Sequence, residues 1–130
     1  MRKRVESGTS WGAVVGYSRA VRVGPLVEVA GTTAALPDGG AVGGRDPAEQ
    51  TREALRRIAA ALEEVGASLE DVVRTRLFVT DIGRWDEFGR VHGEFFAGIR
   101  PVTSMVEVSR LIAPELLVEI EATAICVDRS

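Results

Sequence analysis

The sequence predicts a single α+β domain in which two helices pack on one face of a single β-sheet. Five stretches that read as strands, most of them alternating apolar and polar residues, surround two stretches in which apolar residues recur every three or four positions. The chain has 130 residues, the size of one ordinary domain. We therefore expect one domain over residues 1–130 with the order ββαβαββ.

The first half of the chain predicts a hairpin followed by a helix. Residues 20–23 and 26–30 alternate and are separated by Gly24-Pro25, which favours a tight turn between antiparallel strands. Residues 1–10 are polar and aperiodic, which predicts a loose N-terminal arm. Asp46, Pro47 and Glu49 then form a helix start resembling a capping box, and Gly66 is placed to end that helix.

The second half predicts a strand, a helix and two further strands. Residues 72–79 alternate, and Asp81 is placed to cap a second helix that ends near Gly98. We expect the apolar stripe of this helix to supply most of the aromatic core; it consists of Trp85, Phe88, His92, Phe95 and Phe96. Residues 102–108 and 117–127 are strand-like and complete the sheet.

Counting alternate residues assigns side chains to the two faces of this sheet. In the last strand Val118 and Ile120 should face the helices, which directs Glu119 and Glu121 to the open face. The same counting brings further side chains to that open face: Arg74, Arg76, Phe78, Thr103, Met105 and Glu107. Because this face mixes charges with apolar groups, we expect it to be covered by packing between subunits.

Composition restricts the classes of function. The chain is 45% hydrophobic and 27% charged, and no stretch approaches the roughly 20 apolar residues of a membrane span. A net charge of −3, without a basic block, argues against a nucleic-acid partner. The basic start is not followed by an apolar segment, and Cys126 is the single cysteine, so we expect a cytoplasmic protein without disulfides.

Several segments together resemble the RidA/YjgF family of reactive-intermediate deaminases, whose older label is L-PSP endoribonuclease. They include residues 14–17, residues 62–73, Phe95-Phe96, Pro101 and residues 118–121. The resemblance implies a fold similar to chorismate mutase. It also implies a homotrimer in which three sheets form a central barrel, with small-molecule clefts between subunits.

The resemblance also implies a chemistry and a set of site residues. Family members of the deaminase branch hydrolyse enamines and imines, such as 2-aminoacrylate, without a metal or a cofactor. The glutamate that helps to activate water corresponds to Glu119, and the pocket tyrosine corresponds to Tyr17. The carboxylate-binding arginine of the Pro-x-Arg-Ser segment is replaced by Thr103, and a pocket asparagine is replaced by Gly89. We expect Thr103 and Met105 to line the cleft.

Each of these residues has a structural alternative. Arg76 either contacts the ligand in place of the missing arginine or forms an ion pair with Glu107 or Glu121 at an interface. Glu119 is either a general base or a structural carboxylate, and Tyr17 either binds substrate or is simply packed. His92 has no second ligand at metal-binding spacing, so we expect it to line its helix.

Three functions follow from these alternatives. The first is hydrolysis of a small enamine or imine that differs from 2-aminoacrylate. The second is a non-catalytic trimer that binds a small metabolite. The third, ribonuclease activity or inhibition of translation, is disfavoured by the acidic composition.

Overall fold

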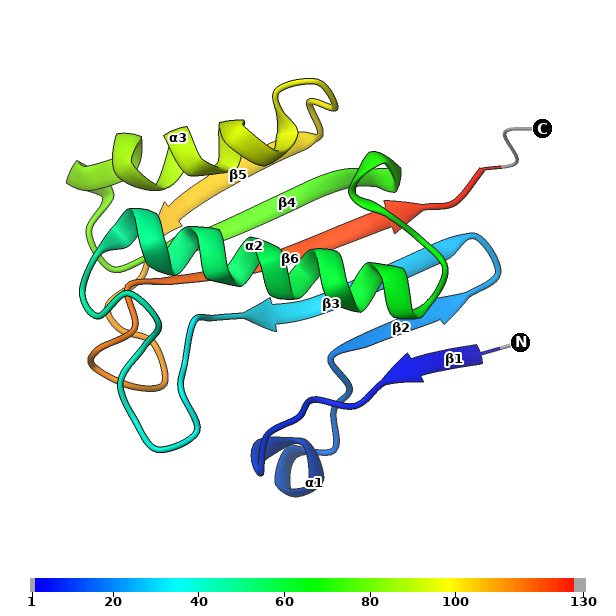
Figure 1. Cartoon of the computed structure of the whole chain (residues 1–130), viewed down its shortest axis with the longest axis horizontal. Helices are drawn as coiled ribbons and strands as arrows, with labels where there is room; N and C mark the ends of the chain where they lie inside the picture. The colour runs from blue at the N-terminus through cyan, green and yellow to red at the C-terminus, as the bar shows by residue number, and fades with distance from the viewer. Residues whose placement is uncertain (1, 128–130) are drawn as a thin grey trace.

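The computed structural model describes residues 2–127 and shows six strands in one sheet, covered on one face by two helices (Figure 1). The elements in chain order are β1 (Arg2–Val5), α1 (Trp11–Val15), β2 (Ala20–Val23), β3 (Leu26–Thr32), α2 (Pro47–Glu64), β4 (Val72–Val79), α3 (Trp85–Phe96), β5 (Val102–Glu107) and β6 (Val118–Ile125). Short 3₁₀ turns precede β4 and α3, at Leu69–Asp71 and Ile82–Arg84. The predicted fold class is confirmed.

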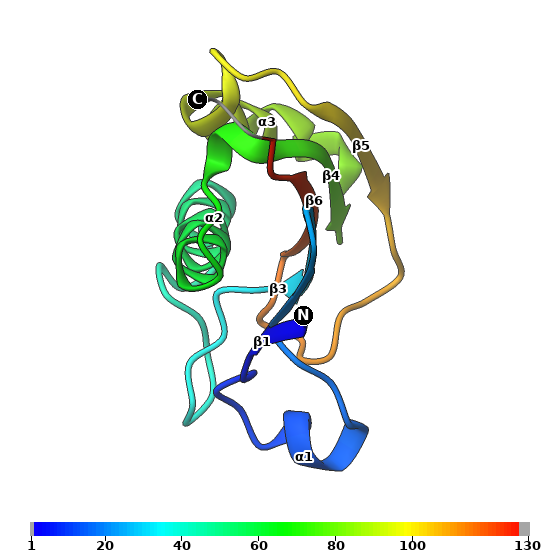
Figure 2. The same ribbon diagram turned by 90° about the vertical axis from the view of Figure 1, so that its right-hand side faces the viewer.

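The strands lie in the order β1-β2-β3-β6-β4-β5. Neighbouring strands are antiparallel except β4 and β5, which are parallel because α3 carries the chain back along the sheet. β6 therefore lies inside the sheet between β3 and β4, whereas β5 forms an edge. Figure 2 shows the sheet from the side, with α2 on one face and α1 beyond the end of the sheet.

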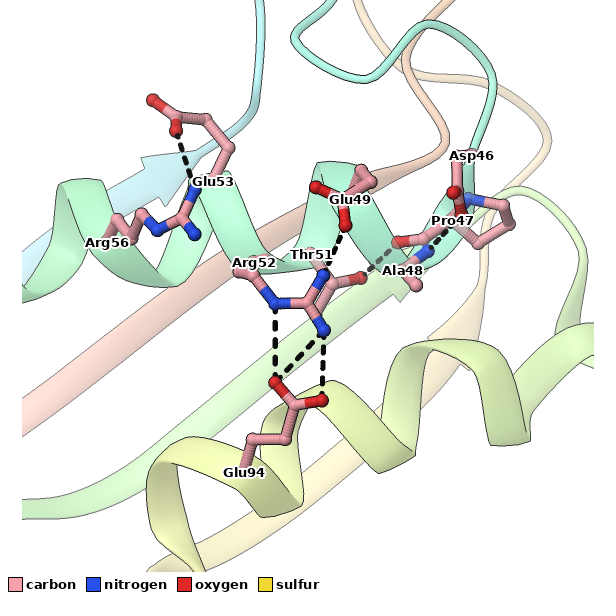
Figure 3. A network of polar contacts seen from close by, with 9 residues as sticks. All are labelled: Asp46, Pro47, Ala48, Glu49, Thr51, Arg52, Glu53, Arg56 and Glu94. Atoms are coloured by element: carbon pink, nitrogen blue, oxygen red, sulfur yellow. Dashed lines mark hydrogen bonds and ion pairs between the residues drawn. The ribbon is translucent and has the colours of Figure 1, made fainter.

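The predicted capping signals of α2 are partly confirmed. Asp46 Oδ1 accepts a hydrogen bond from the backbone N–H of Ala48 at 2.9 Å, and Gly66 follows the helix with a φ of 79°. Glu49 does not close a capping box but instead forms an ion pair with Arg52 (Figure 3). Arg52 also binds Glu94 of α3 at 2.9 Å, so this guanidinium joins the two helices.

The core lies between the sheet and the helices. Leu55, Ile58 and Leu62 of α2 and Phe88 of α3 are fully or almost fully buried there. Alternate residues of β6 face them, as the sequence predicts: Val118, Ile120, Ala122 and Ala124. The intervening residues of β6 are half-buried on the other face, where Glu119 and Glu121 lie. This parity places two carboxylates on the open face.

Two expectations for less regular parts of the chain are wrong. Arg2–Val5 is not loose, because it pairs with β2 as an antiparallel edge strand, Arg2 opposite Val23 and Val5 opposite Ala20. Its residues are exposed or half-buried, and of the four only Val5 packs against the core, so no apolar pattern predicts this strand. Trp85 is 61% exposed rather than part of the core, because it begins α3 at the rim of the sheet.

Candidate functional site

Glu119 is the most unusual ionisable residue on the open face. Its side chain is half-buried, and within residues 2–127 its carboxylate has no hydrogen-bond or ion-pair partner. Burial raises the pKa of Glu119, and the nearby charge of Glu121 adds to the effect. A carboxylate that is partly desolvated and unpartnered is suited to accepting a proton near neutral pH.

Gly31 makes room for this carboxylate. β3 has an irregular register between Val29 and Thr32, and the Glu119 side chain lies against Gly31 within that irregularity. A Cβ atom added at Gly31 would lie only 2.7 Å from the Glu119 carboxyl carbon. The sequence marks Gly31 only as the end of a strand, so its role in seating Glu119 becomes visible only in three dimensions.

Arg76 and Glu121 lie next to Glu119 on the same face. Arg76 Nη1 is 3.4 Å from Glu121 Oε1, and both side chains are partly exposed. They line a shallow depression of about 320 Å³ together with Glu28 and Ser18. Arg76 therefore pairs with Glu121 within one chain rather than across an interface. Glu107 is not its partner, since Glu107 Oε1 accepts the N–H of Ile82 at 3.0 Å.

The predicted placement of Thr103, Met105 and Glu107 on the open face is wrong. In the parallel register, Thr103 lies beside Thr75, Met105 beside Leu77 and Glu107 beside Val79. These three β4 residues are fully buried beneath the helices. Met105 accordingly packs against the helix-side core. Thr103 and Met105 thus lie on the opposite side of the sheet from Glu119.

The counting failed because β5 is an edge strand. By simple alternation the apolar Val102 and Val106 would face the helices, yet they are 61% and 47% exposed on the open face. An edge strand that is covered incompletely does not have to direct its apolar residues toward the core. Only the pairing with β4 fixes which side each residue faces.

Thr103 is connected to α3 by a chain of hydrogen bonds. Thr103 Oγ1 donates to the carbonyl of Pro101 at 3.2 Å and lies 2.8 Å from Thr75 Oγ1, which lies 2.8 Å from His92 Nε2. With Thr103 donating to Pro101, the remaining groups are satisfied if Thr75 donates to Thr103 and His92 Nε2–H donates to Thr75. A half-buried histidine thereby holds the Thr103 hydroxyl in place, a link that the sequence does not reveal.

Tyr17 directs its hydroxyl to the N-terminal segment rather than to these residues. It follows α1, whose C-terminal Gly16 has a φ of 82°, and its hydroxyl is 3.4 Å from Thr9 Oγ1. Within residues 2–127 it makes no hydrogen bond to Glu119, Arg76 or Thr103. Glu119, Arg76 and Glu121 thus share one face of the sheet, Thr103 lies on the other face, and Tyr17 bonds none of them within the described residues.

The His92 ring also gives a pH-dependent prediction. Burial lowers the pKa of His92 from its usual 6.5, so the unfolded chain takes up this proton more readily than the folded chain. The contribution of neutral His92 to the free energy of unfolding is therefore present above pH 6.5 and is lost as the pH falls below that value. We expect urea unfolding to show a smaller loss of stability from pH 7.5 to pH 5.5 in His92→Gln than in the unaltered chain.

Glutamine is a suitable replacement because it keeps a donor for Thr75, and no other histidine is present to titrate in this range. Equal pH dependence in the two proteins would show that His92 is not the group that titrates.

Within residues 2–127 no three histidine, cysteine, aspartate or glutamate side chains are grouped to hold a metal ion. No helix in that range is long and apolar enough to cross a membrane. The fold and site thus define a class: an α+β domain with helices on one sheet face and, on the other, ionisable groups beside an unpartnered carboxylate.

Comparison with known proteins identifies the family within this class. The family model described as Endoribonuclease L-PSP matches residues 8–126. A RutC family protein of Pyrococcus abyssi is 39% identical over 108 residues, which cover 83% of this chain and 84% of that protein. The crystal structure of Rv2704 from Mycobacterium tuberculosis, a member of the YjgF/YER057c/UK114 family, is 62% identical. The superposition covers 96% of this chain and 99% of the Rv2704 chain, with a TM-score of 0.87.

A solved structure with a bound small molecule is also similar. Escherichia coli TdcF with bound serine is 28% identical, covers 85% of this chain and 88% of its own, and gives a TM-score of 0.76. The chain belongs to the RidA/YjgF family, which is also described as the L-PSP endoribonuclease family. The resemblance seen in the sequence is confirmed.

Proposed function

We propose that this protein is a hydrolytic deaminase of a small enamine or imine, with Glu119 as the group that activates water. The observation that carries the proposal is the Glu119 carboxylate, half-buried against Gly31 and without a partner in residues 2–127. Membership of the family supports a small-molecule deaminase or a related role. Solvent-exposed carboxylates with ordinary pKa values are poor bases at neutral pH, whereas this one has a raised pKa.

The reaction requires one base that later serves as an acid. Glu119 takes a proton from water as the water oxygen attacks the imine carbon, which forms a carbinolamine. The carboxylic acid returns this proton to the nitrogen, which leaves an amino group beside the new hydroxyl. Glu119 then transfers the hydroxyl proton to the amino nitrogen as the C–N bond breaks, so ammonia leaves and the oxygen becomes the carbonyl of the product. Water supplies all the atoms gained, so the step needs neither a metal nor a redox cofactor.

We further propose that the site is completed by a second copy of the chain in a homotrimer. Thr103 and Glu119 lie on opposite faces of one sheet, so they can line a common cleft only if they come from different subunits. The open face supports such packing because it exposes apolar residues beside its charges, among them Val102 and Val106. In this arrangement Tyr17 and Met105 of adjoining subunits would contact the same ligand.

The substrate that we propose lacks the carboxylate of 2-aminoacrylate, or bears it elsewhere. Thr103 offers a hydroxyl where deaminase-branch members carry a guanidinium, and Arg76 is already paired with Glu121. A hydroxyl cannot replace the bidentate contact that arginine makes with a carboxylate. We also place the reaction in the cytoplasm, which the lone Cys126 supports.

Restoring the arginine tests this specificity. We expect Thr103→Arg to raise kcat/KM for 2-aminoacrylate by about 10-fold or more, because a charge-assisted hydrogen bond is worth roughly 1.5–3 kcal/mol. Thr103 is exposed at the sheet edge, so the longer side chain has room. The measurement is ammonia release, with Thr103→Gln as the uncharged control. An equal gain for an imine without a carboxylate would count against this account.

A second candidate is a trimer that binds a metabolite without transforming it. The replacements at Thr103 and Gly89 favour it, since both remove polar groups that family members carry in the pocket. In that case Glu119→Gln would leave ligand binding intact and no variant would release ammonia. Cleavage of RNA, the activity in the family's older description, is supported less, because the open face carries Glu28, Glu119 and Glu121 on a chain of net charge −3.

A further inference from the structure

A cavity lies away from Glu119, beside α2 on the helix side of the sheet. It measures about 730 Å³ and lies between the N-terminal segment around Trp11, the loop around Leu36 and one flank of α2. In Figure 2 the loop that follows β3 lies on the same side of the sheet as α2, and α1 lies beyond the end of the sheet. None of the residues assigned above to the deaminase site lines this cavity.

Two arginines contribute to its wall. Arg19 donates to the carbonyl of Ser7 at 2.8 Å and to Thr32 Oγ1 at 3.2 Å, which holds its guanidinium in place. Arg57 of α2 donates to the carbonyl of Thr33 at 2.8 Å and pairs with Glu53 at 2.9 Å. Both guanidiniums retain N–H donors beyond these bonds.

Arg19 is the unusual one of the pair. Within residues 2–127 no carboxylate forms an ion pair with it, although its side chain is half-buried. Burial lowers the pKa of Arg19; the nearby Tyr17 hydroxyl acts against this shift, and the charge of Arg57 adds to it. Glu115 also lines the cavity but accepts the N–H of Gly40, and Glu64 is exposed. The Arg19 guanidinium therefore lacks a compensating anion.

The rest of the wall is largely apolar. Trp11 and Leu36 line the cavity and remain 38% and 43% exposed, and Ala60 and Pro37 adjoin them. Large apolar groups that face an open cavity beside a cation favour a ligand with an anionic head and an apolar body. We propose that this cavity binds a small monocarboxylate of that kind, with its carboxylate held by Arg19 and Arg57 and its body against Trp11 and Leu36.

Benzoate, benzamide and inorganic phosphate are suitable probes, measured by titration calorimetry on the full chain. We expect benzoate to bind and benzamide, which has the same shape without the charge, to bind at least about 10-fold more weakly. Arg19→Gln and Arg57→Gln should each weaken benzoate binding by a similar factor. Arg56→Gln is the matched control, because Arg56 precedes Arg57 on α2, contacts the same Glu53 and does not line the cavity.

Arg19→Gln also removes the contacts that hold the N-terminal segment, so its folding is checked by circular dichroism and its melting temperature. Arg57→Gln keeps the proposal testable if that variant is unstable. Equal binding of benzoate and benzamide, or unchanged benzoate binding in Arg57→Gln, would overturn the proposal. Phosphate binding as tight as benzoate would overturn the assignment of an apolar body.

Discussion

Glu119→Gln is expected to lower kcat/KM for imine hydrolysis by about 10²- to 10⁴-fold, the usual contribution of a general base. Glutamine preserves the shape of the side chain against Gly31 but cannot take a proton from water. The matched control is Glu121→Gln, which changes a carboxylate on the same strand and face that is already paired with Arg76. We expect the control to retain most activity in the ammonia-release assay.

The same variant separates a catalytic carboxylate from a structural one. Because burial raises the folded-state pKa of Glu119, its protonated form is favoured in the folded chain. The stability gained from that proton is present at low pH and is lost as the pH rises through the folded-state pKa. At neutral pH the ionised carboxylate therefore opposes folding. Glu119→Gln should melt at an equal or higher temperature, whereas a lower melting temperature would indicate a structural role.

Gln50→Leu is expected to destabilise the chain by about 2–6 kcal/mol, since it leaves the backbone groups of the half-buried Glu115 and Leu117 without partners, at roughly 1–3 kcal/mol each. Gln50 is fully buried in the first turn of α2. Its amide donates to the carbonyls of Gly44 and Glu115 at 2.7 and 2.9 Å, and Oε1 accepts the N–H of Leu117 at 2.9 Å. One side chain thus fixes the loop before α2 and the entry to β6.

Thr51→Val is the matched control for Gln50→Leu. Thr51 is equally buried, but its hydroxyl bonds only the carbonyl of Pro47 in the same helical turn, at 2.7 Å. We expect that control to cost no more than about 1.5 kcal/mol. Urea unfolding at a fixed protein concentration makes the comparison, because assembly makes stability concentration-dependent. Equal losses in the two variants would show that Gln50 does not anchor the loops.

The parts of the fold that the sequence predicted are those in which local pattern and burial agree. Periodicity predicts β4 and the two faces of β6, and capping predicts the start of α2 at Asp46. The structure contains all three features. Arg2–Val5 could not be predicted in this way, because edge pairing with β2 needs only backbone groups.

The candidate site was predictable only where a buried strand fixed the faces of its residues. Glu119 and Arg76 flank residues packed under the helices, so counting placed both correctly. Thr103 and Met105 lie on an edge strand, where the parallel register with β4, unknown from the sequence, decides their side. The contacts of Gly31 with Glu119 and of His92 with Thr75 join distant segments and have no local signal.

Ammonia release by the unaltered chain is the most direct test of the proposed function. The substrates are 2-aminoacrylate, generated in the assay, and a matched imine without a carboxylate, each compared with the rate in buffer alone. We expect hydrolysis well above the buffer rate, faster for the imine without a carboxylate, because Thr103 stands where deaminase-branch members carry the arginine that binds that group. Release at the buffer rate for both substrates would contradict it and would favour a protein that binds its ligand without transforming it.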